Sequence, residues 1–268
     1  MKFYIKAMTR PVIFIFLNLL VLIFAINVSG EERIYAGLTL TEIFPDQAVR
    51  QLAVAAENGD INEINKLIKQ GVKVNYAGKY GITPLWWPLT AFYYTSNPKC
   101  YDGFACLLKN GADPNVQIKG GYDNVMYVAA EVNDTRFLAA AVNAGGNVNL
   151  VSKPDLSLSS APLSAGATPI FGAILIQSRA NIQFLVSHGA NLNVRESNFG
   201  NTPMMCAGML NDFEDVYYLL LKGADPTIKN NSGLTIIWCT AHSRVSLQSD
   251  AGKWLLKVID LLQKKGVL

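Results

Sequence analysis

The stretch TPMMCAGMLNDFEDVYYLLLKGADPT, residues 202–227, decides the fold of this 268-residue chain. Thr202 is of a residue type that caps the start of a helix, and Pro203 suits the first helical position, where its missing N–H is not needed. A second apolar run over residues 216–221 stops at Gly223, which readily adopts the left-handed conformation of a helix end. The stretch therefore predicts two short helices joined by a turn.

The same pattern recurs along the chain. Phrases like Gly-Ala-Asp-Pro-Asn begin at Gly71, Gly111, Gly145, Gly189 and Gly223; the second and fourth spacings are equal, and the other two are longer. Thr-Pro pairs begin at Thr83, Thr168 and Thr202, and Thr235 follows Thr202 at nearly the spacing that separates Thr168 from Thr202. Such a period indicates repeats that stack on one another, because a single unit cannot bury both of its faces.

A period of about 33 residues with these two phrases resembles ankyrin repeats over residues 46–267. The resemblance implies an all-α ankyrin-repeat solenoid of about six helix-turn-helix units with finger hairpins between them. The third unit begins at Tyr122 with Asn124 in place of Thr. The domain boundaries expected from this pattern are a linker over residues 31–45 and an ankyrin-repeat domain over residues 46–268.

Three insertions interrupt the period. They fall near residues 94–101, within residues 151–165 and around residues 243–252. Loops on a rigid scaffold often carry binding residues, but surface insertions without function are also tolerated. The sequence leaves both interpretations open for these segments.

The first thirty residues have the composition of an export signal. Lys2, Lys6 and Arg10 precede an apolar run over residues 12–28, which ends in small residues. We expect residues 1–30 to be a signal peptide or, as the alternative, an uncleaved signal anchor, because the run is near the shortest membrane-spanning length. Both predict a periplasmic protein, soluble after cleavage and attached to the inner membrane without it.

The formal net charge of +3 comes from this segment alone. It holds three of the 23 Lys and Arg residues and none of the 20 Asp and Glu residues, so the rest of the chain is neutral. Scattered basic residues in a neutral chain do not suit a phosphate backbone, and we expect no nucleic-acid partner. The composition, 50% hydrophobic and 16% charged, excludes a disordered chain.

Catalytic motifs are missing from the sequence, which has no G-x-S-x-G elbow, phosphate-binding glycine loop or H-E-x-x-H motif. His188 is expected to be structural, and His242 is expected to face a contact surface. Asp212, Glu214 and Asp215 suit the positive end of a helix dipole. We therefore expect a protein that is not an enzyme and that uses no cofactor or metal.

The four cysteines are expected to divide into two groups. Cys206 and Cys239 each follow a repeat threonine by four residues, so they occupy equivalent positions in adjacent units. Helices about 8–10 Å apart hold such positions too far apart for a disulfide, and we expect two buried free thiols there. For Cys100 and Cys106, a disulfide and two free thiols both remain open.

The resemblance to ankyrin repeats implies an interaction surface at the finger tips and at the ends of the first helices. The residues projected to bind protein are Lys79, Tyr80, Tyr93, Tyr94, Tyr122, Glu131, Asn198, Phe199, Met209, Asn231 and His242. The same projection exposes Glu57 and Thr90. Aromatic residues are concentrated in the segment from Tyr80 to Phe104, and both core packing and partner contact remain open for them. Trp86 and Phe104 are expected to pack inside.

The two ends of the repeat region resemble one group more closely. Residues 42–60 and 254–267 are similar to the ends of exported bacterial ankyrin proteins that are encoded beside type VI secretion phospholipase effectors. Some members of that group are immunity proteins, so the resemblance implies a periplasmic protein of a Gram-negative bacterium that binds and occludes such an effector. We expect it to be a monomer when free. A general periplasmic scaffold or stress-support protein is the alternative, and an enzyme built on the solenoid is a further one.

Overall fold

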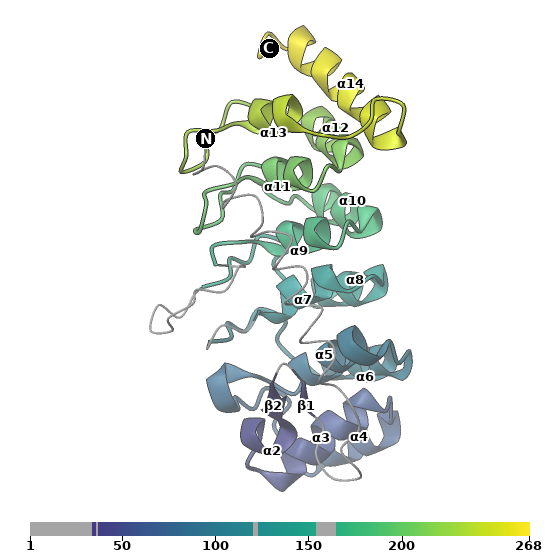
Figure 1. Ribbon diagram of the computed structural model, residues 1–268. Coiled ribbons are helices and arrows are strands. Elements are labelled where there is room, and N and C mark those ends of the chain that lie inside the picture. Colours follow the sequence, from purple (N-terminus) through teal and green to yellow (C-terminus); the bar gives the residue numbers. More distant parts are fainter. Residues whose placement is uncertain (1–33, 36, 120–122, 154–164) are drawn as a thin grey trace.

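The computed structural model describes residues 34–35, 37–119, 123–153 and 165–268, and its helices stack into an elongated solenoid (Figure 1). Within these residues, six helix pairs follow one another, and each pair packs on its neighbour. The first helices of the pairs lie beside the finger loops, and the second helices form the other layer (Figure 1).

The first helices, called the inner helices below, have the following bounds: α3 (Gln47–Glu57), α5 (Trp86–Thr95), α7 (Val125–Glu131), α9 (Pro169–Leu175), α11 (Pro203–Met209) and α13 (Ile236–His242). The second or outer helices are α4 (Ile61–Lys69), α6 (Lys99–Lys109), α8 (Thr135–Asn143), α10 (Arg179–Ser187), α12 (Phe213–Leu221) and α14 (Asp250–Lys264). The remaining elements are β1 (Ile34–Tyr35), β2 (Leu38–Thr39), α2 (Leu40–Ile43) and the 3-10 turn η2 (Lys79–Gly81).

The segment before the first pair packs onto the stack. β1 and β2 form a short antiparallel pair, and α2 begins at a capping box in which Thr39 and Glu42 each accept a hydrogen bond from the other's backbone N–H. Leu40, Ile43 and Phe44 are buried in the core. This arrangement differs from the linker expected over residues 31–45, because a run this short carries no helical or strand period that would reveal it.

Polar caps begin several inner helices as the repeated phrases predict. The Thr202 hydroxyl accepts a hydrogen bond from the backbone N–H of Met205 at 3.3 Å, at the start of α11. Asn124 caps α7 in the same way and accepts from the N–H of Tyr127 at 3.0 Å. In the second unit the helix begins later, at Trp86, so its Thr-Pro pair precedes the helix without capping it.

Asparagine side chains join the loops of successive units. The Asn75 amide donates to the carbonyl of Gly111 at 2.8 Å, and its oxygen accepts from the backbone N–H of Asp113 at 2.8 Å. Asn115 and Asn149 make the same two bonds to the units that follow them. At about 0.5–1.5 kcal/mol net for each bond, this ladder explains why the repeated phrase so often ends in Asn.

The hydrophobic core runs through the stack and includes most of the aromatic residues in the window from Tyr80 to Phe104. Phe137 on α8 is fully buried, and its ring contacts Phe92, Tyr101 and Phe104 at centroid distances of 4.7, 5.3 and 5.2 Å. Trp86 is only 2% exposed. The prediction that Trp86 and Phe104 pack inside is therefore confirmed, and core packing prevails over partner contact for most of this window.

The insertions have different outcomes. Near residues 94–101 the extra residues lengthen the helices, since α5 has 10 residues and α6 has 11 where α7 and α8 have seven and nine. The insertion around residues 243–252 forms the connection into α14. Most of the loop expected over residues 151–165 lies outside the described residues, as does the expected signal over residues 1–30. No described helix has the length and apolar character that a membrane span requires.

Candidate protein-interaction surface

One position of the inner helices carries partly or wholly exposed side chains in four successive units. Seven residues after the N-cap of α7, α9, α11 and α13 stand Glu131, Leu175, Met209 and His242. Leu175 is 48% exposed and Met209 is 52% exposed. Because neighbouring inner helices contact one another, these four residues form a continuous series, which we call the inner row.

An aromatic pair closes the inner row at α13. Trp238 is 42% exposed, and its ring stacks on His242 with centroids 4.6 Å apart and an angle of 17° between the planes. His242 Nδ1 lies 3.0 Å from the carbonyl oxygen of Trp238, one helical turn earlier. The stack holds a large flat surface in place, which suits Trp238 to an interface contact.

The other end of the inner row has acidic and aromatic character. Tyr127 and Glu131 are four residues apart, a spacing that places them along one side of α7, and Asp123 directly precedes the N-cap Asn124 of that helix. Tyr93 of the preceding inner helix, α5, interacts electrostatically with Glu131 and Asp123 and is 43% exposed. We call these four residues the Glu131 site.

Gly172 on α9 makes room for the Glu131 site. A Cβ atom there would lie 2.9 Å from Cγ of Glu131 and 3.0 Å from the carbonyl oxygen of Tyr127. The equivalent positions of the next two units, four residues after the N-cap, hold Cys206 and Cys239. The glycine therefore lets the Glu131 side chain lie across α9, an arrangement that the following units do not repeat.

Burial and like charge shift the ionisation of this site. Burial raises the pKa of Glu131 well above its ordinary value, and the negative charge of Asp123 raises it further. Burial also raises the pKa of Tyr93 to about 12 and that of Tyr127 well above the usual value, with Glu131 adding to both. Both tyrosines therefore stay neutral around pH 7, and Glu131 keeps its proton to a higher pH than an exposed glutamate would.

The first finger presents Lys79 and Tyr80. Lys79 is exposed and lies 3.8 Å from a carboxylate oxygen of Glu42, and its ammonium is 5.3 Å from the centroid of the Tyr80 ring. Tyr80 is 39% exposed, and its carbonyl accepts a hydrogen bond from the N–H of Lys119 in the next finger. Backbone bonds between fingers thus fix where these side chains point.

A second pair of fingers presents Asn198, Phe199 and Asn231. The buried carboxylate of Glu196 accepts backbone hydrogen bonds from Asn198 at 2.6 Å and Phe199 at 3.0 Å, which fixes the turn. The Asn231 N–H donates to the carbonyl of Phe199 at 2.8 Å, and Asn231 also accepts from Arg195. Phe199 is 61% exposed, the highest exposure among the large apolar side chains that the structure describes.

Some projected contact residues are not where the sequence placed them. Glu57 and Thr90 were expected at the exposed ends of the inner helices, but both are buried. Glu57 accepts a hydrogen bond from Nε1 of Trp87 at 2.8 Å, a partner that the sequence did not indicate. Tyr94 is half-buried, and Tyr122 lies outside the described residues.

All four cysteines are free thiols. The expected absence of a bond between Cys206 and Cys239 agrees with this finding, although Cys206 is half-buried and only Cys239 is fully buried. Cys100 and Cys106 both lie on α6 and are not bridged. Burial raises the pKa of Cys206 to about 12 and that of Cys239 to about 11, so neither thiol is a ready nucleophile.

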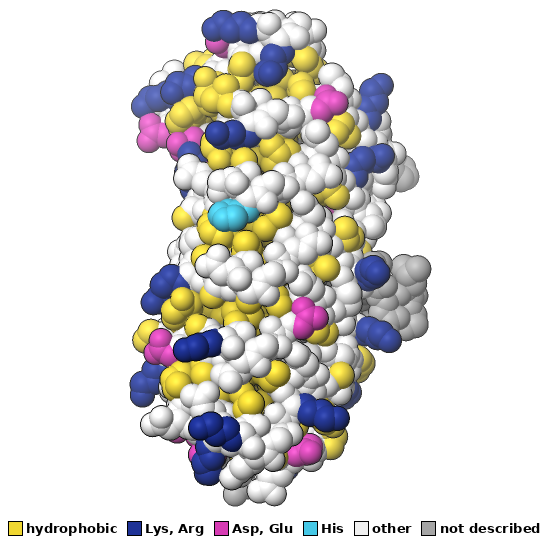
Figure 2. Space-filling view, turned by 180° about the vertical axis from the view of Figure 1, so that it is seen from behind, with side chains coloured by type: hydrophobic (Ala, Val, Ile, Leu, Met, Phe, Trp, Pro, Cys, Tyr) yellow, Lys and Arg dark blue, Asp and Glu magenta, His cyan; other side chains and the backbone are white. Residues whose placement is uncertain are grey.

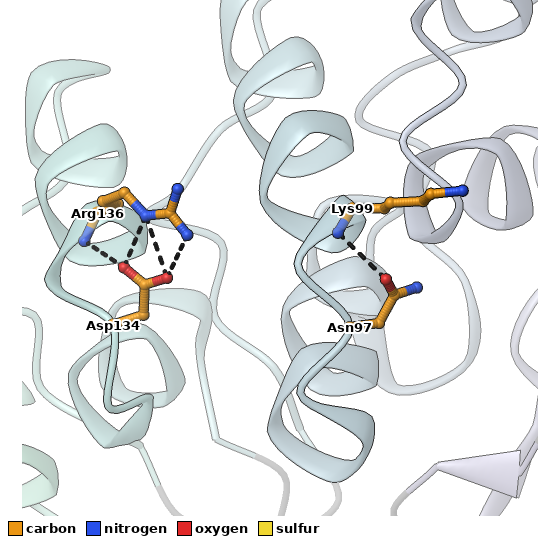
Figure 3. A network of polar contacts seen from close by, with 4 residues as sticks. All are labelled: Asn97, Lys99, Asp134 and Arg136. Atoms are coloured by element: carbon orange, nitrogen blue, oxygen red, sulfur yellow. Dashed lines mark hydrogen bonds and ion pairs between the residues drawn. The ribbon is translucent and has the colours of Figure 1, made fainter.

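The surface outside the inner row is mixed in character. Figure 2 shows one face of the molecule, on which apolar side chains lie in separate patches and Lys and Arg are spread along its length. At the start of α8, Arg136 donates from its backbone N–H and its guanidinium to the carboxylate of Asp134, which lowers the pKa of Asp134 (Figure 3). Asn97, one residue before the N-cap of α6, accepts a hydrogen bond from the N–H of Lys99 (Figure 3). These contacts stabilise helix starts.

One acidic cluster also has a structural role. Arg179 on α10 forms ion pairs with Glu214 and, at 2.7 Å, with Asp215 on α12, and it lies 3.8 Å from Asp212. Burial and the charge of Asp212 raise the pKa of Asp215 to about 7, against the opposing effect of Arg179. The three acidic residues were expected to favour a helix start; the sequence did not reveal that an arginine of the preceding unit joins them.

The described residues hold no group of three or more His, Cys, Asp and Glu side chains that could bind a metal ion. A hollow of about 470 Å³ lies between α4 and α6 and is lined by residues such as Asn65, Asp102 and Lys109. His188 stacks on Phe184 at 4.0 Å on an exposed helix end, which is a structural contact. The Cys106 thiol also lines the hollow, where its hydrogen bonds go to the side chains of Asn65 and Asn110, and burial raises its pKa, so the thiol is not activated there.

Stacked helix pairs with finger loops are the architecture of an ankyrin-repeat solenoid, and the comparisons agree. Residues 125–230 match the family model for ankyrin repeats in three copies. Among solved structures, the ankyrin repeat domain of Bcl-3, a member of the IkappaB family, superposes with a TM-score of 0.60 at 20% identity. That match covers 81% of this chain and 86% of the other, and it shows the shared fold.

One protein that is similar in sequence is much longer than this chain. A Danio rerio protein described as the palmitoyltransferase ZDHHC13 is 26% identical over 209 residues, which is 77% of this chain. The matched region is only 29% of that protein. The chain thus spans less than a third of the relative's length.

Proposed function

We propose that this chain is a non-catalytic protein-binding module of the periplasm, an immunity protein that binds and occludes a phospholipase-type effector delivered by type VI secretion. The observation that carries the binding function is the inner row, where Leu175, Met209 and His242 present exposed side chains in three successive units. Exposed apolar and aromatic side chains in a continuous series are typical of protein contact surfaces.

The finer part of the proposal has support from the sequence. Residues 42–60 and 254–267 resemble the ends of exported ankyrin proteins encoded beside such effectors, and residues 1–30 resemble an export signal. Phospholipase effectors act from the periplasmic side of the membrane, so an exported inhibitor would meet them there. The inhibition needs no reaction of its own, because a rigid surface that covers the mouth of the lipase active site excludes the lipid.

A lipase assay tests this proposal. The purified chain is added to the phospholipase encoded nearest to its gene, and hydrolysis of phospholipid vesicles is measured. We expect inhibition by the wild type and by Leu221→Asp, which adds a charge to an exposed residue of the outer helix α12. A double variant, Leu175→Asp with Met209→Asp, should fail to inhibit.

Two other outcomes would change the interpretation. A pull-down with the purified chain complements the lipase assay. If the pull-down recovers only endogenous envelope proteins and the chain leaves hydrolysis unchanged, a periplasmic scaffold function replaces the immunity function. If the double variant inhibits as well as the wild type, the inner row is not the contact surface, and the finger tips with Tyr80 and Phe199 take its place as the candidate.

A further inference from the structure

An apolar seam with lysines beside it lies between α12 and α14, at the C-terminal end of the stack. The rings of Tyr217 and Trp254 join the two helices with centroids 5.5 Å apart, and both side chains are half-buried. Leu221 is one helical turn after Tyr217 on the same side of α12 and is 58% exposed. The ammonium of Lys257 lies 3.8 Å from the centroid of the Trp254 ring. We call these four residues, together with Lys222, the α12–α14 patch.

The lysines of the patch keep their positive charge uncompensated. The ammonium of Lys222 lies 5.6 Å from the ring centroid of Tyr218, and neither Lys222 nor Lys257 forms an ion pair within the described part of the chain. Each acidic residue on the two helices already has a basic partner: Glu214 and Asp215 pair with Arg179, Asp250 with Lys253, and Asp260 with Lys264. Figure 2 shows apolar side chains next to Lys or Arg near the upper, C-terminal end of the molecule. The patch therefore combines apolar surface with an excess of positive charge.

The composition of the patch fits the surface of an anionic membrane. Tryptophan and tyrosine are enriched at the boundary between lipid headgroups and acyl chains, because one end of each side chain is apolar and the other is polar. Lysine covers apolar surface with its methylene stem and leaves its ammonium group available to lipid phosphates. Each lysine near an anionic surface strengthens binding about fivefold.

A lipid surface satisfies the whole patch more simply than an acidic protein does. An acidic protein that pairs with Lys222 and Lys257 would also need apolar side chains placed to cover Leu221 and Trp254. A lipid layer offers negative charge and an apolar layer at every point, so it needs no matching sequence. The patch lies on the outer helices at the end of the stack, away from the finger loops, where a flat surface can approach it (Figure 1).

We propose that the α12–α14 patch binds the surface of a membrane that contains anionic lipids. Trp254 and Leu221 lie at the level of the headgroups, and Lys222 and Lys257 contact lipid phosphates. This inference goes beyond the proposed function, because lipid contact through the outer helices requires neither the inner row nor an effector. It leaves the inner row free for a protein while the outer helices rest on the membrane.

Quenching of tryptophan fluorescence by lipids that carry a nitroxide in the headgroup tests the inference on the full chain. The chain has four tryptophans; Trp86 and Trp87 are buried, and residues 1–30 contain none, so the quenching reports on Trp238 and Trp254. Vesicles of phosphatidylcholine alone are compared with vesicles that also contain phosphatidylglycerol. We expect quenching on the anionic vesicles that is lost in Trp254→Phe and kept in Trp238→Phe.

Charge variants separate the patch from general attraction to the vesicles. In the Trp238→Phe background, Lys222→Gln combined with Lys257→Gln should lower the ratio of quenched to unquenched emission about 25-fold, since each lysine contributes about fivefold. The matched control is Lys66→Gln combined with Lys69→Gln, which removes the same charge from the exposed end of the outer helix α4 and should leave the ratio unchanged. Urea unfolding checks that both variants remain folded.

Each outcome bears on the inference. Quenching that survives Trp254→Phe, that is equal on neutral vesicles, or that falls equally in the α4 control would overturn it. Absence of quenching on anionic vesicles would overturn it as well, and a shift of Trp254 emission with poly-glutamate would then assign the patch to an acidic protein.

The inference and the proposed function fail separately. Leu221→Asp should lower the quenching and yet inhibit the effector like the wild type. If the wild type does not inhibit the effector but Trp254 is quenched on anionic vesicles, the proposed function fails and the membrane contact stands.

Discussion

The helix pairs of this solenoid serve two opposite purposes. On the sides that face neighbouring units, residues such as Phe137 and Asn181 are fully buried and bonded or packed. On the inner row, Leu175 and Met209 are about half exposed although they belong to helices that are otherwise buried. The difference teaches that stability and recognition are assigned to separate residues of one repeat, so substitutions should separate the two properties.

The largest expected effect is on the packed side. Phe137→Ala removes a ring that contacts three aromatic side chains from α5 and α6, and we expect a loss of about 3–5 kcal/mol in the free energy of unfolding. Urea unfolding followed by circular dichroism measures it. Phe199→Ala, at a residue that is 61% exposed, is the control and should change the free energy by about 0.5 kcal/mol or less. Equal effects of the two substitutions on the free energy of unfolding would contradict the assignment of stability and recognition to separate residues.

The second largest effect on stability is expected at the buried amide side chain of Asn181. Asn181 on α10 donates to the carbonyls of Ala130 and Val132 at 3.0 and 2.8 Å, and it accepts from the Thr135 hydroxyl at 2.7 Å. Asn181→Ala leaves these groups unpaired between two units, so we expect a loss of about 2–3 kcal/mol. Asn143→Ala, on an exposed residue of α8, is the matched comparison in the same unfolding experiment. A loss at Asn181 no larger than that at Asn143 would show that these bonds do not hold the units together.

A pH-dependent effect is expected at the Arg179 cluster. Asp215 has a pKa of about 7 in the folded chain, above its ordinary value, so the folded state holds this proton more tightly than the unfolded state does. Stability contributed by the protonated form is therefore lost as pH rises from about 4 to about 7 and is constant above that range. Asp215→Asn should reduce this slope, while Asp260→Asn, on an exposed ion pair of α14, should preserve it. Unfolding midpoints at several pH values decide the matter.

The fold was largely predictable because its signals are local and repeated. Thr202 and Asn124 cap helices where the period places them, and the Gly-Ala-Asp phrases mark the ends of the outer helices. The packing of Leu40 and Phe44 could not be predicted, because no period covers so short a segment. The pairing of Glu57 with Trp87 also depends on a contact across units, which spacing within one unit does not reveal.

The candidate surface was predictable only in part. Glu131, Met209 and His242 followed from their place at the ends of inner helices, but Leu175, which occupies the same position, was missed. Counting seven residues from each capping residue would have found it. The role of Gly172 could not be found in this way, because it depends on the path of the Glu131 side chain across a neighbouring helix.

The smallest effect on stability, and the sharpest test of the division, is expected on the inner row. Leu175→Ala combined with Met209→Ala removes side chains that are already about half in water, so each change should alter the free energy of unfolding by about 0.5 kcal/mol or less. Affinity for the effector should nevertheless fall about tenfold, because truncating apolar anchors at a contact surface costs about 1–2 kcal/mol. Isothermal titration calorimetry and urea unfolding on the same sample measure both quantities. A double variant that loses stability and affinity together would show that the inner row also supports the packing of α9 on α11, and the two purposes would then share residues instead of dividing them.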